Sequence, residues 1–107
     1  MTRSLSLLPF ALAIFLGPAH AASFPQRTVS VTVPYGAGGS TDGIARKFAT
    51  LLSEELKQPV VVLNQPGASG TLQLANLARA RPDGYTIGFY SYSTVTFTSQ
   101  LMKVPFK

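Results

Sequence analysis

The sequence predicts an α/β protein in which parallel strands and helices alternate in the order β-α-β-α-β. Three segments have strand-like composition, and the two segments between them carry apolar residues at helical spacing. Because the links are short, right-handed crossovers between parallel strands are expected. In such a sheet, ligands bind outside the carboxyl ends of the strands, which here lead into loops 34–41, 64–70 and 91–96.

Residues 1–21 have the composition of a secretory signal peptide. Arg3 and the amino terminus give a positive start, and residues 5–16 are mostly apolar. Small residues then stand at the two positions that a signal peptidase recognises, which predicts export with cleavage after Ala21. The apolar run is too short to span a bilayer.

The first strand is expected at residues 28–33, where β-branched and small polar residues alternate. The loop after it contains three glycines, which can adopt positive φ and let another molecule approach the backbone closely. Ser40 or Thr41 can cap the following helix, and Asp42 suits the positive end of its dipole. Free N–H groups at this helix start would suit an anion. The alternative is an ordinary capped connection with glycine at the bend.

The helix that follows is predicted from apolar residues at helical spacing. These residues are Ile44, Phe48, Leu51, Leu52 and Leu56. Lys57 and Gln58 precede Pro59, which ends the element because proline cannot continue a helix.

The second half of the chain repeats the same alternation of strand and helix. Residues 60–63 are four consecutive apolar residues, which indicates a strand covered on both faces. Loop 64–70 is followed by a short apolar helix at 71–80, a turn at 82–84 and a third strand at 85–90.

The tail, residues 91–107, is rich in Ser and Thr, whose hydroxyls are interpreted as loop residues rather than ligand donors. A sheet of three parallel strands with two helices leaves a face or an edge uncovered. Residues 22–107 are therefore expected to form an incomplete domain.

The composition excludes several classes of function. The formal net charge is +5, but the basic residues are scattered and form no stripe that could follow nucleic-acid phosphates. There is no cysteine, and the one histidine, His20, lies in the signal segment. No metal site and no cofactor are therefore expected. Of the few acids, only Asp42 lies near the glycine loop, so the chain is not expected to be an enzyme.

Five segments in order resemble the periplasmic substrate-binding proteins of tripartite tricarboxylate transporters, the Bug family. The strongest match is the glycine loop with Asp42 and Arg46, which is close to the family's P-[FY]-x-A-G-G-x-x-D-x-x-A-R signature. Leu63 and Gln65 replace an acid and a base of the family pattern, and Ser69 replaces a glycine. The matching segments are residues 24–27, 33–46, 58–70, 80–86 and 103–106.

The resemblance implies a fold of two domains that close over a ligand like a clamshell, of which residues 22–107 would be the start of the first domain. It also implies capture of a small carboxylate-bearing solute and its delivery to the membrane subunits of a transporter. The full-length protein would be a monomer, and the segment alone is expected to be inactive.

The resemblance further implies that the first loop holds a ligand carboxylate through backbone groups and ordered water. The candidate residues there are Tyr35, Gly36, Ala37, Gly38, Gly39, Ser40, Thr41 and Asp42. Asp42 cannot pair directly with an ionised carboxylate, so it is expected to fix the helix start or to orient a water molecule. The second-loop candidates are Asn64, Gly67, Ala68, Ser69 and Gly70.

A nucleotide-binding half-domain of Rossmann type is the alternative. Gly36 and Gly38 match the first two glycines of G-x-G-x-x-G, but Thr41 stands in place of the third. The second strand ends in Leu63 and Asn64, where a ribose-binding acid would be expected. No lysine follows the glycines as in a phosphate-binding loop.

Overall fold

The structure, a computed structural model, describes residues 22–101 and 103–104. The predicted signal peptide, residues 1–21, lies outside the described residues, as do 102 and 105–107. The element order confirms the predicted β-α-β-α-β alternation. The elements are β1 (Val29–Val33), α1 (Ser40–Leu56), β2 (Val60–Asn64), α2 (Thr71–Arg79) and β3 (Thr86–Gly88).

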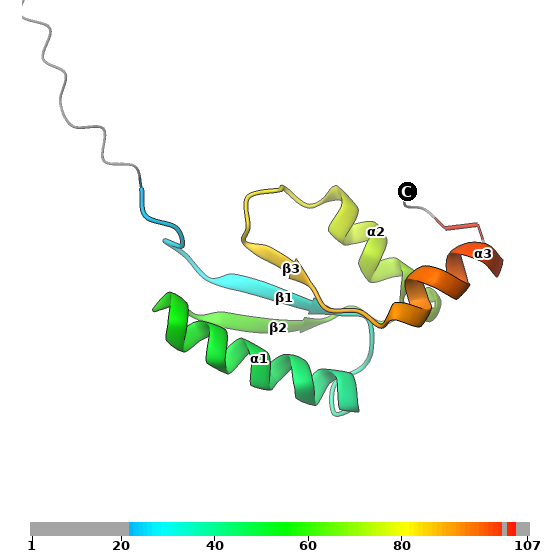
Figure 1. Cartoon of the computed structure of the whole chain (residues 1–107), viewed down its shortest axis with the longest axis horizontal. Coiled ribbons are helices and arrows are strands. Elements are labelled where there is room, and N and C mark those ends of the chain that lie inside the picture. The colour runs from blue at the N-terminus through cyan, green and yellow to red at the C-terminus, as the bar shows by residue number, and fades with distance from the viewer. Residues whose placement is uncertain (1–21, 102, 105–107) are drawn as a thin grey trace, which may run out of the picture.

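The three strands form one parallel sheet in the order β2-β1-β3. Val31 of β1 lies opposite Val62 on one side and Ile87 on the other. Figure 1 shows α1 and α2 on opposite faces of this sheet. The chain thus moves one way from β1 to β2 and the other way to β3, which creates a topological switch point between the carboxyl ends of β1 and β3.

The core lies between β1 and α1. Val31 and Val33 are fully buried and pack against Ala45 and Ala49 of the helix. Both helix residues are small, so α1 can lie close to the branched side chains of the central strand. This packing sets the position of the amino-terminal end of α1 relative to the carboxyl end of β1.

On the other face of the sheet, α2 is held by a buried amide. Gln73 is fully buried, and its Nε2 donates to the backbone oxygen of Thr32 at 3.2 Å and to Thr32 Oγ1 at 2.7 Å. A Cβ at Gly88 would overlap the Leu77 side chain and lie 3.1 Å from Gln73 Nε2. Glycine at position 88 is therefore what lets α2 approach the sheet so closely.

The expectation that the second strand is covered on both faces is wrong for this structure. Val60 and Val62 pack against the core, but Val61 and Leu63 are 40% and 44% exposed. The reason is the strand order, because β2 is an edge strand and α2 packs against β1 and β3. Only α1 covers β2, and it covers one face.

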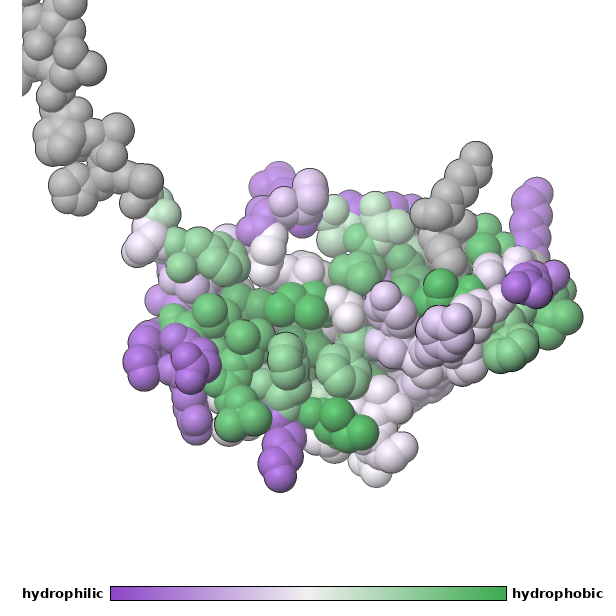
Figure 2. Space-filling view, viewed as in Figure 1, coloured by the Kyte–Doolittle hydropathy of each residue, from purple (hydrophilic) through white to green (hydrophobic). Residues whose placement is uncertain are grey.

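The apolar residues that predict α1 are also more exposed than the helical pattern suggests. Ile44, Phe48 and Leu51 are 60%, 40% and 56% exposed, whereas the buried helix residues that contact the sheet are alanines. Figure 2 shows apolar side chains gathered over this part of the molecule. Among the residues that the structure describes, no helix is long and apolar enough to cross a membrane.

Two short helical segments lie outside the predicted elements. A 3-10 turn, Ala68–Gly70, precedes α2 within the second loop. A π-helical turn, Thr94–Thr98, continues into α3 (Ser99–Leu101) in the tail that was expected to be loop. The tail prediction missed this helix because its Thr and Ser residues have low helix propensity and it spans little more than two turns.

Candidate functional site

The three loops that leave the carboxyl ends of the strands meet at one point. Gly70 is buried there, and a Cβ on it would lie 3.1 Å from Thr94 Cγ2 and 3.3 Å from Pro34 Cβ. Gly70, a predicted ligand residue, therefore packs between the first and third loops. Its glycine is required both by this close contact and by its φ of +89°.

Asp42 is the centre of a hydrogen-bond network at the start of α1. Its carboxylate is 3% exposed and accepts from the Gly38 N–H, from Arg46 Nε and from Asn64 Nδ2, each at 2.9 Å. The Arg46 side chain, with the Gly38 and Asn64 hydrogen bonds, holds the pKa of this carboxyl well below its usual range. The role predicted for Asp42, fixing the helix start, agrees with these contacts.

Asn64 joins the end of β2 to the glycine loop. Its Nδ2 donates to the Tyr35 backbone oxygen at 2.9 Å, and its Oδ1 accepts from Arg46 Nη2 at 3.2 Å. The amide of this second-loop candidate is therefore engaged by the protein itself. Arg46 was not among the predicted site residues, although its position four residues after Asp42 on the helix is a signal for such a pair.

The start of α1 is capped differently from the expectation. Gly39 is the N-cap residue, and no side chain caps the helix, so capping by Ser40 or Thr41 is wrong. The first N–H to bond within the turn is that of Gly43, which donates to Gly39 O at 3.0 Å. In the described part of the chain, the N–H groups of Gly39, Ser40 and Thr41 have no protein acceptor.

The glycine loop needs glycine at one position more than at its neighbour. Gly38 has a φ of +92°, in the left-handed region, whereas Gly39 has a φ of −78° and extended backbone. A Cβ at Gly39 would meet only Gly36 O at 3.9 Å. Of these two glycines, only Gly38 therefore has a backbone conformation that would be strained in a residue with a side chain. Gly36, Ala37, Gly38 and Gly39 are all exposed.

The second loop makes a left-handed turn. Gly67, Ala68, Ser69 and Gly70 all have positive φ, of 146°, 46°, 54° and 89°. Ala68 and Ser69 are exposed, and such conformations are unfavourable for residues with a side chain. Residues held in this way are common at ligand sites, and the role of the second loop stays a prediction.

Tyr35 connects the first loop to the third. Its hydroxyl lies 2.9 Å from Ser91 Oγ and 3.2 Å from Thr94 Oγ1. These two hydroxyls lower the pKa of the Tyr35 phenol by hydrogen bonding to it. Ser91 and Thr94 were not among the predicted site residues, and the sequence offers no signal that would select them from the other hydroxyl residues of the tail.

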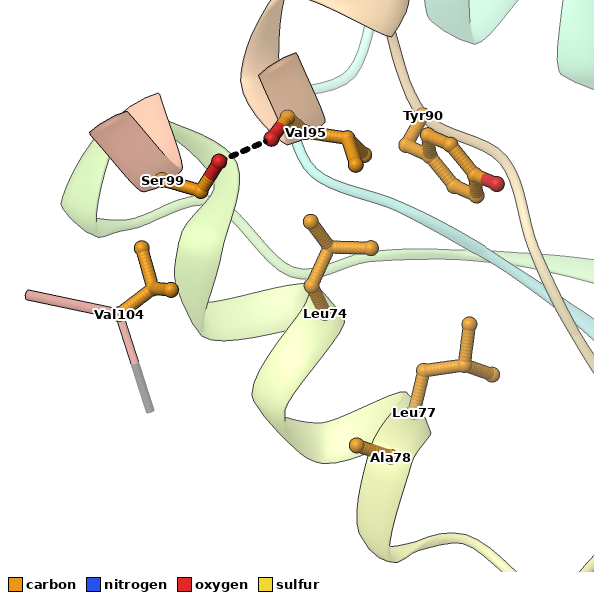
Figure 3. Close-up of a pocket in the computed structure, with 7 residues that line it drawn as sticks. All are labelled: Leu74, Leu77, Ala78, Tyr90, Val95, Ser99 and Val104. Atoms are coloured by element: carbon orange, nitrogen blue, oxygen red, sulfur yellow. Dashed lines mark hydrogen bonds between the residues drawn. The ribbon is translucent and has the colours of Figure 1, made fainter. Parts of the chain in front are cut away.

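An apolar hollow of about 470 Å³ lies apart from these residues, between α2 and the segment after β3 (Figure 3). It contains none of the predicted ligand residues. Its walls are Leu74, Leu77, Ala78, Tyr90, Val95, Ser99 and Val104. Within residues 22–101 and 103–104, no three His, Cys, Asp or Glu side chains gather as a metal site would require.

The sequence and the fold were compared with known proteins. The profile of the TctC family, described as tripartite tricarboxylate transporter family receptor, matches residues 44–107. A UPF0065 protein of Bordetella pertussis is 41% identical over 98 residues, which cover 91% of this chain and 30% of that protein. The chain therefore spans about a third of the length of this curated relative.

Solved structures show the same similarity. A TctC solute binding protein from Polaromonas superposes with a TM-score of 0.68 at 35% identity, over 77% of this chain and 29% of that protein. MatC from Rhodopseudomonas palustris, solved with bound malate, superposes with a TM-score of 0.59 at 45% identity. That match covers 61% of this chain and 22% of MatC.

Proposed function

Because the chain belongs to the TctC family of tripartite tricarboxylate transporter receptors, we propose that it serves the capture of a small carboxylate-bearing solute. The predicted family is thereby confirmed. The solute would be held at the carboxyl ends of the strands, by the glycine loop and the start of α1. Delivery to the membrane subunits of a tripartite transporter would follow in the periplasm, after removal of residues 1–21.

One observation carries this proposal. The N–H groups of Gly39, Ser40 and Thr41 lack a protein acceptor at the positive end of the 17-residue helix α1. They lie beside exposed glycine backbone, so a carboxylate can approach without meeting side chains. An anion there gains charge-assisted hydrogen bonds and the favourable field of the helix dipole.

The other predicted site residues take supporting roles in this proposal. Asp42 repels a carboxylate, so it acts by holding Gly38 and the helix start in place. Asn64 fixes the loop through the Tyr35 backbone oxygen. The exposed turn of Ala68 and Ser69 faces solvent from the second loop and is available for further ligand contacts.

The same contacts bear on whether the protein is an enzyme. Asp42, the one acid predicted near the site, is engaged in hydrogen bonds that hold the helix start, and the family is one of receptors, so we expect binding without catalysis. The Rossmann alternative loses support, because the chain belongs to a receptor family and lacks both the third glycine and the ribose-binding acid of that pattern. Residues 22–107 would form part of the first of two domains, and the full-length receptor would be a monomer.

The experiment is titration of the full-length receptor with L-malate, because the segment alone is expected to be inactive. Backbone amide shifts are recorded by NMR. We expect the largest shifts at residues 39–41, and loss of ten- to a hundredfold in affinity for Gly39→Val, roughly one or two charge-assisted hydrogen bonds. The valine suits the φ of −78° but covers the free N–H groups. Lys57→Ala, at the other end of α1, should bind as the parent does.

A titration with dimethyl malate, which has no ionised carboxylate, serves as the ligand control. Amide shifts of residues 39–41 that are equal for malate and its ester would contradict recognition of a carboxylate. Unchanged malate affinity in Gly39→Val would move the site away from the helix start.

A further inference from the structure

Three hydroxyl groups from the first and third loops form a closed triangle. Tyr35 Oη lies 2.9 Å from Ser91 Oγ and 3.2 Å from Thr94 Oγ1, and the two aliphatic hydroxyls lie 3.0 Å apart. Ser93 Oγ adds a fourth contact, 3.0 Å from Ser91 Oγ. The triangle joins residues that are 56 and 59 positions apart in the chain.

The number of hydroxyl protons in the triangle limits which groups it can bind. Each hydroxyl carries one proton, and three hydrogen bonds among three hydroxyls use all three protons. A carboxylate is only an acceptor, so it would need a proton that the closed triangle does not have. The cluster is therefore suited to joining the two loops and unsuited to binding the solute.

The second loop meets the same cluster through packing. Thr94 is 3% exposed, and its Cγ2 is the nearest atom to the position of a Cβ on Gly70. Thr94 therefore contacts the second loop with its methyl group and the first loop with its hydroxyl. The two contacts can be tested separately, because one substitution of Thr94 can remove its hydroxyl and another can remove its methyl group.

The glycine loop is consequently held by three sets of contacts, one of which is the bond from Asn64 Nδ2 to the Tyr35 backbone oxygen. Tyr35 is fastened to the third loop by the hydroxyl triangle, and Gly38 is fastened to α1 by its N–H bond to Asp42. Between them, Gly36 and Ala37 are exposed. A loop held at both ends keeps its N–H groups in one arrangement before a ligand arrives, so less conformational entropy is lost on binding.

We propose that Tyr35, Ser91 and Thr94 form a latch that positions the glycine loop for carboxylate binding. Tyr35 is then a positioning residue and its hydroxyl makes no ligand contact. The effect on affinity rests on the proposed function, whereas the effect on loop order does not.

The test uses the full-length receptor and two readouts, NMR order parameters of residues 36–39 and the affinity for L-malate. In the parent, the backbone order parameter of these residues should be near the value of about 0.85 typical of rigid backbone. Tyr35→Phe and Thr94→Val should lower it toward the flexible limit of about 0.6. Both should weaken malate binding roughly threefold to tenfold, the effect of about one hydrogen bond.

Three further variants separate a latch from general packing. Thr94→Ser keeps the hydroxyl and loses the methyl, so it should retain the order and affinity of the parent. The double variant Tyr35→Phe/Thr94→Val should lose no more than Tyr35→Phe alone, because the Tyr35 hydroxyl makes both bonds that join the two loops. Tyr92→Phe makes the same chemical change on a side chain that is 79% exposed, and it should change nothing.

The outcomes distinguish this proposal from the proposed function. Order parameters at 36–39 that stay at the parent value in Tyr35→Phe would overturn the latch, whatever malate does. If the order parameters fall as expected but the parent binds no malate, the latch stands and the proposed function fails. If Thr94→Ser is as disordered as Thr94→Val, the contact is one of packing and the latch is wrong.

Discussion

The two ends of the β-sheet are fastened by different kinds of contact. At the amino ends of the strands, Arg27 lies 3.8 Å above the Tyr85 ring and pairs with Asp83 at 3.0 Å. Phe24 meets the same ring edge-on, with centroids 5.0 Å apart. The Arg27 and Asp83 side chains are 62% and 34% exposed, so solvent weakens their ion pair.

At the carboxyl ends, the contacts are partly buried, and two of them hold backbone groups. Asp42 and Asn64 bond to the Gly38 N–H and the Tyr35 backbone oxygen, and neither side chain reaches solvent freely. The side chains at the amino end contact one another and accept from the N–H groups of Gln26 and Tyr85. Those at the carboxyl end hold a glycine loop in place, beside N–H groups of α1 that, in the described part of the chain, have no acceptor. We infer from this difference that the carboxyl end, which carries the proposed binding loop, also makes the larger contribution to stability.

The largest expected effect comes from Asn64→Ala. Asn64 links Tyr35, Asp42 and Arg46, so the substitution leaves several partners unsatisfied. We expect a loss of about 2–3 kcal/mol in the free energy of unfolding and a Tm lower by roughly 10–20 °C. Thermal unfolding followed by circular dichroism measures this change.

The control for this substitution is Asn76→Ala, which removes one exposed bond to Gln65 Oε1 at 3.2 Å. It should change the free energy of unfolding by no more than about 0.5 kcal/mol. Equal losses for the two variants would remove the distinction between the network of Asp42 and the rest of the surface.

The second prediction compares neighbouring glycines. Gly38→Ala places a Cβ on backbone with a φ of +92° and should cost about 1–2 kcal/mol, together with most of the malate affinity. Gly39→Ala, at a φ of −78° with no contact closer than 3.9 Å, should be nearly neutral in stability. Chemical denaturation of both variants measures the difference, and a larger loss for Gly39→Ala would contradict the loop conformation.

The third prediction concerns acid. The folded pKa of Asp42 lies below its unfolded value of about 3.9, so the folded state binds fewer protons than the unfolded state there. Its stabilisation is complete above about pH 5 and is lost as the pH falls further. Between pH 5 and 2, the Tm of Asp42→Asn should therefore fall less steeply than that of the parent. Parallel slopes would show that Asp42 has no part in acid unfolding.

The smallest effect is expected at the amino end. Arg27→Ala removes an exposed ion pair and a cation–ring contact, together about 0.5–1 kcal/mol, and the loss should shrink in 1 M salt. Malate affinity should stay at the parent value, because the change lies at the other end of the sheet. A malate affinity lowered as much as by Gly38→Ala would overturn the separation of the two ends.

The sequence predicts the fold well because its strongest signals are local. Alternating or continuous β-branched residues give the strands, and Pro59, Gly84 and the glycine loop mark where elements end. The strand order β2-β1-β3 determines which residues of β2 are covered, and that order depends on contacts between distant segments. The exposure of Val61 and Leu63 could therefore not be obtained from local pattern.

The candidate site also has a part that could be predicted from local sequence and a part that could not. The glycine loop and Asp42 were predicted because glycine backbone and a helix start are adjacent in sequence. The hydroxyl groups that hold Tyr35 were not predicted. Ser91 and Thr94 lie 56 and 59 positions from Tyr35 in the sequence and meet it only in the folded structure. Side-chain capping by Ser40 or Thr41 was wrong because Asp42 uses its carboxylate on Gly38 and the N-cap is Gly39.

The strand order also sets when the sheet can be completed. β1 is made first, yet its Ser30 pairs with Thr86 of β3, so the ribosome must synthesise most of the described chain before the central strand has both neighbours. Pairing over such sequence separations is slow to form. Until Thr86–Gly88 have been made, β1 can pair only with β2. With the order β2-β1-β3, the sheet can be completed only after β3 has been synthesised.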